Sequence, residues 1–369
     1  IPRYDQTIPK HLDYSHIRQW GNTKHIFSKP ADQLKYCASI GSITLMKQQR
    51  LSLITSSQWQ DYELLDSGNL RKFERFGPHR FIRPEPQAMW HPRTEAKDWQ
   101  ADGIFVPGKL GKSDQEEGEG GGWQLSEQLP ESWQLSYQSL RFLARPTPFR
   151  HLGFFPEQAA HWDWCADAVK AFTAYHNRPP RILNLFAYSG LASLHAANAG
   201  AEVTHLDASK KAVAQAFENR DLCAMQHAPI RFITDDATSF VDRELRRKKQ
   251  YDGIILDPPK YGRGPKGEFW RIENHLTPLL QKCHQLLSKD ALLMVLTIYA
   301  IRASSLAAHY ALADLFDGMG GSLESGELAL QESPLVHEES KSSEGGRPER
   351  CIPQANFARW QSNLAMKQD

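Results

Sequence analysis

The feature that most constrains the fold is the alternation of strand-length apolar runs with helix-length segments between residues 181 and 299. Helices between successive strands indicate crossover connections, which bring the strands into parallel register. Continuous apolar runs such as IILD and LLMVL fit strands that are covered on both faces. We therefore predict an α/β fold with a doubly wound, mostly parallel sheet. Its strands are expected in RILNLF (181–186), AEVTHLD (201–207), PIRFITDD (229–236), YDGIILDPP (251–259) and ALLMVLTIY (291–299).

The rest of the chain is expected to add a second, smaller domain, as its length of 369 residues suggests. Residues 1–45 lack periodicity and precede the first methionine, so we expect an irregular arm, and a non-native origin for it stays open. Residues 46–149 carry short strand-like runs that start near Leu51 and predict a β-rich domain, interrupted by a flexible Gly- and Glu-rich loop at 108–122. Residues 150–369 would form the sheet domain and end in an antiparallel hairpin at the sheet edge.

Overall composition narrows the function less than the motifs do. The 44 Lys and Arg against 43 Asp and Glu give a net charge of +1, so a nucleic acid would have to bind local basic patches. The apolar run at 292–301 is too short for a membrane helix. Five scattered cysteines without a CxxC pair or a His/Cys cluster predict a reducing, cytoplasmic setting, no disulfide framework and no metal. The oligomeric state stays open.

Candidate binding residues follow the predicted strands, because ligands of such sheets bind outside the carboxyl ends of the strands. The turn NLFAYSG (184–190) leads from a strand into a helix, and Gly190 permits close backbone approach. Asp207 follows the second strand, where an acid can accept hydrogen bonds from ribose hydroxyls. Asp236 with Ala237 follows the third, and its carboxylate could accept an adenine amine. Both acids are equally explained as residues at helix N-termini, and Asp207 precedes the expected cap Ser209.

The fourth strand end decides between these interpretations. DPPKYG (257–262) places two prolines directly after a buried strand, which ends ladder pairing and fixes the exit of the chain. Asp257 is thereby expected to lie at the sheet tip, beside whatever the NLFAYSG turn binds. Acids at three neighbouring strand ends are hard to obtain by accident.

NLFAYSG, LDASKKAV, DDA and DPPKYG resemble, in order and spacing, the S-adenosylmethionine-binding motifs of class I methyltransferases, which have a Rossmann-like sheet. The similarity covers about residues 150–300 and is greatest to the group of bacterial 23S ribosomal RNA cytosine-5 methyltransferases. FRHLGFFPEQAAHW (149–162) resembles the segment that closes over the methionine part of the cofactor in that group. The resemblance implies S-adenosylmethionine as cofactor and RNA as the substrate. Residues 51–145 resemble that group only loosely.

The resemblance also implies roles for individual residues. Asp207, followed by Ala208 and Ser209, would bind the ribose, and Asp236 with Ala237 the adenine. Asp257 and Pro258 would sit between the transferable methyl group and the acceptor. The methionine part would be bound by Phe155, Gln158, Phe186, Tyr188, Ser189 and Gly190.

One departure from the family concerns the thiol that cytosine-5 chemistry requires. Neither DPPKYG nor LTIYAIRAS (296–304) contains a cysteine, and Cys283 and Cys351 fit ordinary small residues. We therefore expect transfer to nitrogen or oxygen, with Asp257, Lys260 and Tyr261 as the catalytic group that grips the acceptor and stacks on its ring. Methylation of C5 with Cys351 remains an alternative.

Two basic segments could contact RNA. RKFERFGPHRFIRP (71–84) interleaves arginines with phenylalanines, which suits phosphate contacts and base stacking, but an amphipathic hairpin predicts the same letters. GRGPKGEF (262–269) follows the DPP motif and is the better candidate for acceptor contact. RELRRKK (243–249) fits a solvated helix end.

Three rival functions remain at this point. A nicotinamide-dependent reductase would share Asp207, but it predicts a fuller GxGxxG turn and no DPP motif. A methyltransferase could act on a protein or a small molecule instead of RNA. A non-catalytic module could bind cofactor and RNA without turnover.

Overall fold

The computed structural model describes residues 50–56, 58–108, 121–299, 303–333 and 350–363. They belong to one compact unit that begins at Arg50. The predicted N-terminal arm and most of the loop at 108–122 lie outside the described residues. Among the described helices, none is long and apolar enough to cross a membrane.

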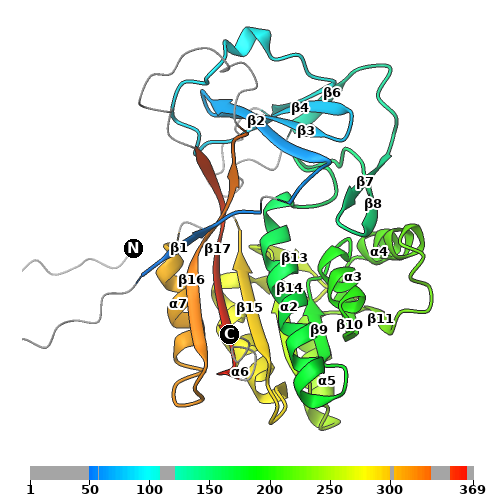
Figure 1. Cartoon of the computed structure of the whole chain (residues 1–369), viewed down its shortest axis with the longest axis vertical. Helices are drawn as coiled ribbons and strands as arrows, with labels where there is room; N and C mark the ends of the chain where they lie inside the picture. Colours follow the sequence, from blue (N-terminus) through cyan, green and yellow to red (C-terminus); the bar gives the residue numbers. More distant parts are fainter. Residues whose placement is uncertain (1–49, 57, 109–120, 300–302, 334–349, 364–369) are drawn as a thin grey trace, which may run out of the picture. The chain divides into compact units, whose positions relative to one another are not determined.

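An eight-stranded, mostly parallel sheet forms the larger part of the structure (Figure 1). Its order is β1-β16-β17-β15-β12-β9-β10-β11, and only the pairings of β17 are antiparallel. The predicted α/β fold is therefore confirmed. The strands are β1 (Ser52–Ile54), β9 (Arg181–Leu185), β10 (Glu202–Asp207), β11 (Ile230–Thr234), β12 (Gly253–Leu256), β15 (Leu293–Ile298), β16 (Ser322–Gln331) and β17 (Cys351–Gln361).

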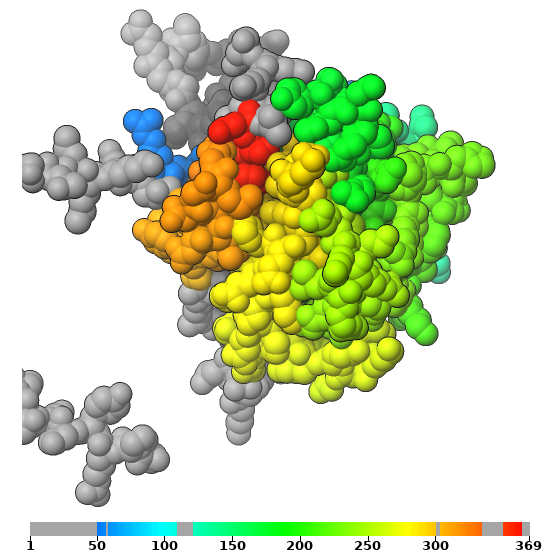
Figure 2. Space-filling view, turned by 90° about the horizontal axis from the view of Figure 1, so that it is seen from below, coloured from blue at the N-terminus to red at the C-terminus, as the bar shows by residue number. Residues whose placement is uncertain are grey.

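Helices cover both faces of this sheet because its strands are apolar on both sides. Val169 and Ala196, from α2 and α3, pack with Ile182 in one core cluster, and Phe240, Leu280 and Ala308, from α5, α6 and α7, pack in another. This two-sided cover makes the sheet doubly wound. The helices are α2 (Ala159–His176), α3 (Leu191–Asn198), α4 (Lys210–Leu222), α5 (Ala237–Arg246), α6 (Ile272–Leu286) and α7 (Ser305–Ala313). Figure 2 views the molecule from below, where yellow and yellow-green segments of its second half form much of the surface.

The outer edge of the sheet differs from the prediction. The antiparallel pairing of β16 with β17 is confirmed, but β17 lies inside the sheet, between β15 and β16. The edge is β1, which pairs in parallel with β16, so the run near Leu51 does not belong to the β-rich part as predicted. Gly326 makes this pairing possible, since any side chain there would collide with the carbonyl of Ser52.

A smaller β-rich part is present, as predicted. It holds a five-stranded sheet, β2-β3-β4-β5-β6, and a hairpin, β7-β8. Lys72 Nζ in β3 donates a 2.6 Å hydrogen bond to Gln354 Oε1 in β17, which ties this part to the large sheet. The strands are β2 (Tyr62–Gly68), β3 (Arg71–Phe76), β4 (His79–Pro84), β5 (Gly103–Pro107), β6 (Gly121–Leu125), β7 (Trp133–Tyr137) and β8 (Leu140–Ala144).

The basic hairpin of this part, β3 with β4, has a structural role. Phe76 and Phe81 are buried in the core, and Arg83 is buried with its guanidinium 2.6 Å from Glu74. The ion pair offsets the cost of burying both charges. Of the two interpretations of RKFERFGPHRFIRP, the amphipathic hairpin is therefore correct for these residues.

Candidate functional site

The acidic strand ends converge at one edge of the large sheet. β9 lies between β10 and β12, with Leu185 paired to Leu206 on one side and to Leu256 on the other. The chain runs outward from β9 to β10 and β11, then returns to β12 on the far side of β9. Such a reversal of strand order opens a crevice at the carboxyl ends of the strands, where ligands of this fold class bind. Asp207 ends β10 and Asp257 directly follows β12, so both lie at this edge of the sheet.

The bend at residues 186–190 has an unusual backbone. Phe186 (φ 57°) and Tyr188 (φ 46°) both adopt the left-handed region, which is uncommon for residues other than glycine. Gly190 has φ 87° and is the N-cap of α3, and a Cβ there would lie 2.8 Å from the Cβ of Ala216 in α4. Such outliers cost free energy and cluster at functional sites. The close contact of Gly190 with Ala216 therefore holds the backbone of the bend against α4.

Gly190→Ala is expected to lower the free energy of unfolding by about 1–2 kcal/mol more than Gly200→Ala, because it adds a steric clash to the backbone strain. Gly200 is the matched control: it also has a left-handed φ (107°), but no atom lies within 4 Å of its Cβ position. Urea denaturation of both variants measures the difference. Equal losses would show that the contact with Ala216 is not tight.

Asp207 connects the bend to the next helix. Its Oδ2 accepts a 2.9 Å hydrogen bond from the Tyr188 amide, and its Oδ1 accepts a 2.8 Å bond from the Ser209 amide. Burial nevertheless raises the pKa of Asp207. Ser209 is the N-cap of α4, so Asp207 indeed precedes a cap, as one of the two interpretations proposed. Each carboxylate oxygen keeps a second lone pair that can accept a hydrogen bond from a ligand.

Asp236 caps the next helix. Its side chain accepts a 2.8 Å hydrogen bond from the Ser239 amide at the start of α5. The helix-terminal interpretation of Asp236 thus holds for one carboxylate oxygen. The role of Asp236 and Ala237 toward an adenine stays a prediction.

Asp257 is the most perturbed carboxyl group of the site. Burial raises its pKa well above the ordinary value, and the nearby carboxylates of Glu157 and Asp207 raise it further. Gln158 Nε2 donates a 3.1 Å hydrogen bond to Asp257 Oδ2, which partly opposes this shift. A carboxyl group with such a pKa at a strand tip is a functional-site candidate.

Two residues that the sequence analysis did not single out complete this acidic cluster. Glu157 is buried next to Gln158, and it accepts a 2.8 Å hydrogen bond from the hydroxyl of Tyr299. Burial raises the pKa of both groups. The position of Tyr299 directly after the fifth strand, where ligands of such sheets bind, is a signal that could have identified it. Glu157 carried no comparable signal.

A cluster of aromatic rings lies at the same strand ends as the carboxylates. The ring centroid of Phe155 lies 5.3 Å from that of Tyr299 and 6.1 Å from that of Tyr188. His151 contacts both Phe155 and Tyr188. The structure thus brings the predicted residues Phe155 and Gln158 to the same edge as Tyr188 and Asp257.

The segment after the DPP motif differs from the sequence prediction. The pattern of FWRIENHLTPLLQKCHQLLS (269–288) predicts one helix, but α6 begins only at Ile272. Phe269–Arg271 instead forms a short strand, β14, which pairs with β13 (Tyr261–Arg263). Lys260 and Tyr261 are exposed at the start of this hairpin. Pro259 accepts a 2.7 Å hydrogen bond from the indole of Trp270, which fixes the hairpin to the strand tip.

The cysteines that the structure describes are not concentrated at this edge. Burial raises the pKa of the Cys165 thiol to about 12, and it raises the pKa of Cys283 in the core as well. Cys223 bonds to the backbone of Arg141. Cys351 begins β17, and lies five residues before Asn356, the partner of Ile298 at the end of β15.

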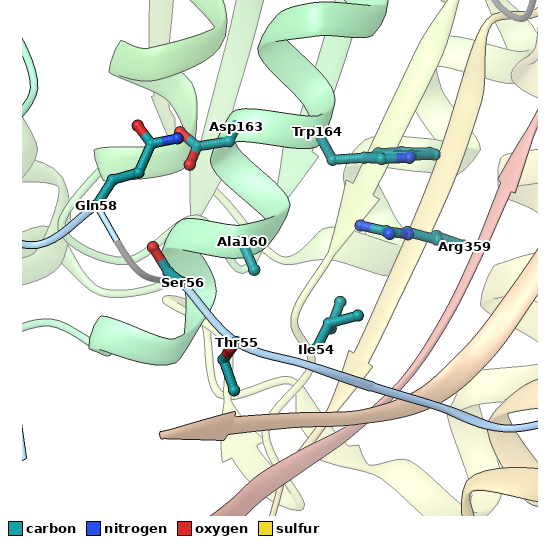
Figure 3. Close-up of a pocket in the computed structure, with 8 residues that line it drawn as sticks. All are labelled: Ile54, Thr55, Ser56, Gln58, Ala160, Asp163, Trp164 and Arg359. Carbon is teal, nitrogen blue, oxygen red and sulfur yellow. The ribbon is translucent and has the colours of Figure 1, made fainter. Parts of the chain in front are cut away.

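A separate cavity of about 230 Å³ lies where β1 meets α2, and it contains none of the predicted site residues. Figure 3 shows the Arg359 guanidinium facing the Trp164 ring, with Asp163 and Gln58 on the other side of the cavity. The guanidinium carbon lies 4.6 Å from the centroid of the ring. Asp163 is already engaged there by the hydroxyl of Tyr137 (2.6 Å) and by Gln138 (2.9 Å). We therefore regard the strand-tip crevice as the candidate active site.

Comparison with known proteins assigns the family. A crystal structure of the S-adenosylmethionine (SAM)-dependent methyltransferase from Agrobacterium tumefaciens shows 43% sequence identity to this chain. The match covers 85% of this chain and 94% of that protein, with a TM-score of 0.75. The chain belongs to the SAM-dependent methyltransferases. Residues 160–300 also match the family model described as conserved hypothetical protein 95.

Curated relatives match a shorter segment of this methyltransferase. A putative ribosomal RNA large subunit methyltransferase from Methanocaldococcus jannaschii is 36% identical over 86 residues, which is 23% of this chain and 22% of the relative. Ribosomal RNA large subunit methyltransferase K/L from Shewanella sp. (strain MR-4) is 39% identical over 90 residues, 24% of this chain and 13% of the relative. The chain thus spans about a fifth or less of the length that these relatives have.

The acidic crevice of the methyltransferase fits S-adenosylmethionine chemically. The cofactor is a sulfonium cation, and a positive charge bound among Asp257, Asp207 and Glu157 would relieve their mutual repulsion. Aromatic faces such as those of Phe155 and Tyr299 also attract cations. The family assignment, rather than this fit, replaces the nicotinamide reductase considered from the sequence by a methyltransferase.

Proposed function

We propose that this enzyme methylates RNA, ribosomal RNA in particular, at a nitrogen or oxygen atom. The observation that carries the proposal is Asp257, a carboxyl group of raised pKa that lies at the sheet tip immediately before an exposed basic and aromatic hairpin. The names of the curated relatives support ribosomal RNA as the acceptor class. The absence of a cysteine from 257–262 and 296–304 supports nitrogen or oxygen over C5.

In this proposal the predicted residues hold the cofactor as their positions suggest. Asp207 accepts hydrogen bonds from the ribose hydroxyls. It uses the lone pairs of its carboxylate oxygens that the Tyr188 and Ser209 amides leave available. Asp236 and Ala237 contact the adenine. The bend from Phe186 through Ser189 to Gly190 lies beneath the methionine part, and Phe155 and Gln158 close over it. Asp257 and Pro258 lie between the transferable methyl group and the acceptor.

The protein's own contribution to the reaction is alignment and proton removal. S-adenosylmethionine, when bound, supplies a methyl group that is activated by the positive sulfur. Gln158 orients the Asp257 carboxylate through its 3.1 Å hydrogen bond. Asp257 then accepts a hydrogen bond from the N–H or O–H of the acceptor and takes its proton, while Lys260 and Tyr261 hold the base. A target base must be unpaired or flipped out to reach this edge.

We also propose that the β-rich part within residues 46–149 helps to bind the acceptor, through surfaces other than the buried faces of β3 and β4. Three alternatives remain. The enzyme could methylate C5 of cytosine through Cys351, it could methylate a protein or a small molecule, or it could bind cofactor and RNA without turnover.

Mass spectrometry of nucleosides, after incubation of total RNA with the enzyme and isotope-labelled S-adenosylmethionine, tests the function. The expected product is a labelled N- or O-methyl nucleoside, formed equally by Cys351→Ser. A labelled 5-methylcytidine that disappears in Cys351→Ser would establish the C5 alternative. Label in protein or small molecules alone would exclude RNA as the acceptor, and no label anywhere would favour the non-catalytic module.

A further inference from the structure

The β13-β14 hairpin has two chemically different faces. Tyr261 pairs with Arg271, and Arg263 pairs with Phe269, so these four side chains share one face of the two-stranded ladder. Gly262 pairs with Trp270 on the other face. Phe269 is 56% exposed and Tyr261 40%, whereas Trp270 is 4% exposed. The hairpin thus buries one aromatic residue and presents two aromatics and two arginines outward.

The buried face fixes the hairpin to the active site. The Trp270 ring packs 5.0 Å from the ring of Phe186 in the bend. Its indole N–H donates to the Pro259 carbonyl, and the Ile272 amide donates a 2.9 Å bond to the Lys260 carbonyl. The outward face is therefore held beside Asp257 and cannot swing freely.

The outward side is also positively charged. Lys260, Arg263, Lys266 and Arg271 are exposed, and among the described residues none of them forms an ion pair with a carboxylate. Glu268, the one acid between residues 260 and 271, accepts a 2.8 Å hydrogen bond from the Lys266 amide and so closes the turn. The uncompensated cations are complementary to a phosphate backbone.

From this juxtaposition we propose that the outward face of β13-β14 binds single-stranded RNA next to the target nucleotide. Phe269 stacks on a flanking base, and Arg263 and Arg271 contact neighbouring phosphates, the combination by which proteins hold single strands. The inference rests on the proposed RNA acceptor and adds the surface that selects an unpaired strand. The β3-β4 hairpin, with similar letters, cannot serve in this way because its phenylalanines are buried.

Binding of a fluorescently labelled 12-nucleotide single-stranded RNA, measured at several salt concentrations, tests the proposal. Arg263→Gln/Arg271→Gln is expected to weaken binding and to lower the slope of log affinity against log salt by about 1.4, because each lost phosphate contact on a single strand removes about 0.7. Phe269→Leu is expected to weaken binding about 10-fold with an unchanged slope, because it keeps an apolar side chain but loses the stacking ring.

Arg246→Gln/Lys249→Gln, at and just after the end of α5, removes the same charge from another exposed segment and should leave both affinity and slope unchanged. Binding of S-adenosylhomocysteine, measured by calorimetry, checks that each variant is folded. Wild-type RNA binding by both hairpin variants, or equal losses in the α5 variant, would overturn the proposal even if the enzyme methylates RNA. A wild-type enzyme that labels no RNA would instead refute the proposed acceptor. A wild type that binds no RNA and labels only protein would overturn both.

Discussion

Asp257→Ala is expected to lower the rate of methyl transfer at least about 100-fold, since a positioned proton acceptor contributes a factor of this order. Binding of S-adenosylhomocysteine should change by less than about threefold, because the cofactor contacts proposed for Asp207 and the bend remain. Single-turnover rates and calorimetry separate the two effects. An active Asp257→Ala enzyme would remove this residue from the catalytic group.

Asp257→Asn is the matched control, because it keeps the shape and the hydrogen-bonding partner but cannot take a proton. The raised pKa means that Asp257 becomes ionised at higher pH than an ordinary aspartate. Wild-type turnover should therefore rise with pH through this range, and the residual activity of Asp257→Asn should not.

The raised pKa of Asp257 has the opposite effect on stability: turnover should rise with pH, but the stability of the unliganded protein should fall. A carboxyl group whose pKa is raised by folding stabilises the protein below its unfolded pKa, and this contribution is lost as the pH rises through the folded value. Asp257→Asn should remove that loss and raise the thermal stability at neutral pH. A variant that is both inactive and less stable than wild type at neutral pH would indicate a structural role.

Asp207→Ala is expected to weaken binding of S-adenosylhomocysteine about 10- to 150-fold, because the loss of one charge-assisted hydrogen bond to the ribose costs about 1.5–3 kcal/mol. Part of the loss would come from the bend, since the Tyr188 and Ser209 amides lose their acceptor. Calorimetry measures the affinity. Unchanged binding would show that the ribose is not held at this strand end.

Glu202→Ala provides the control for this variant. Glu202 is an exposed carboxylate at the opposite end of the same strand, β10. Its substitution removes the same charge far from the candidate site. Asp207→Asn tests the hydrogen bonds separately, because its amide oxygen can still accept one of the two backbone bonds. We expect wild-type affinity from the first and an intermediate affinity from the second.

The order of strands and helices between residues 181 and 299 could be predicted from the sequence because these strands carry apolar runs and helices connect them. The acids at the strand ends were found for a related reason: parallel topology alone places Asp207 and Asp257 at one edge. Glu157 could not be predicted because its significance depends on Tyr299, 142 positions away, whose hydroxyl donates a hydrogen bond to it. Local patterns contain no information about such a pair.

Pairing between distant strands was equally hard to predict. A three-residue strand such as β1 has little periodicity of its own, and its place is decided by Gly326 on β16. The β13-β14 hairpin was hidden because Phe269–Arg271 continues the apolar pattern of the helix that follows it. The β3-β4 and β13-β14 hairpins show what sequence patterns cannot predict. Their amino-acid compositions are similar, but only tertiary packing decides which phenylalanines face outward.

The position of β17 inside the sheet has a consequence for biosynthesis. Residues 351–361 are the last strand of the described chain to leave the ribosome, yet they separate β15 from β16. Until they emerge, the exposed side of β15 has no partner, and β16 together with β1 cannot join the other strands. The nascent enzyme thus depends on late, long-range pairing, which is slow and leaves an open strand edge for chaperones to shield.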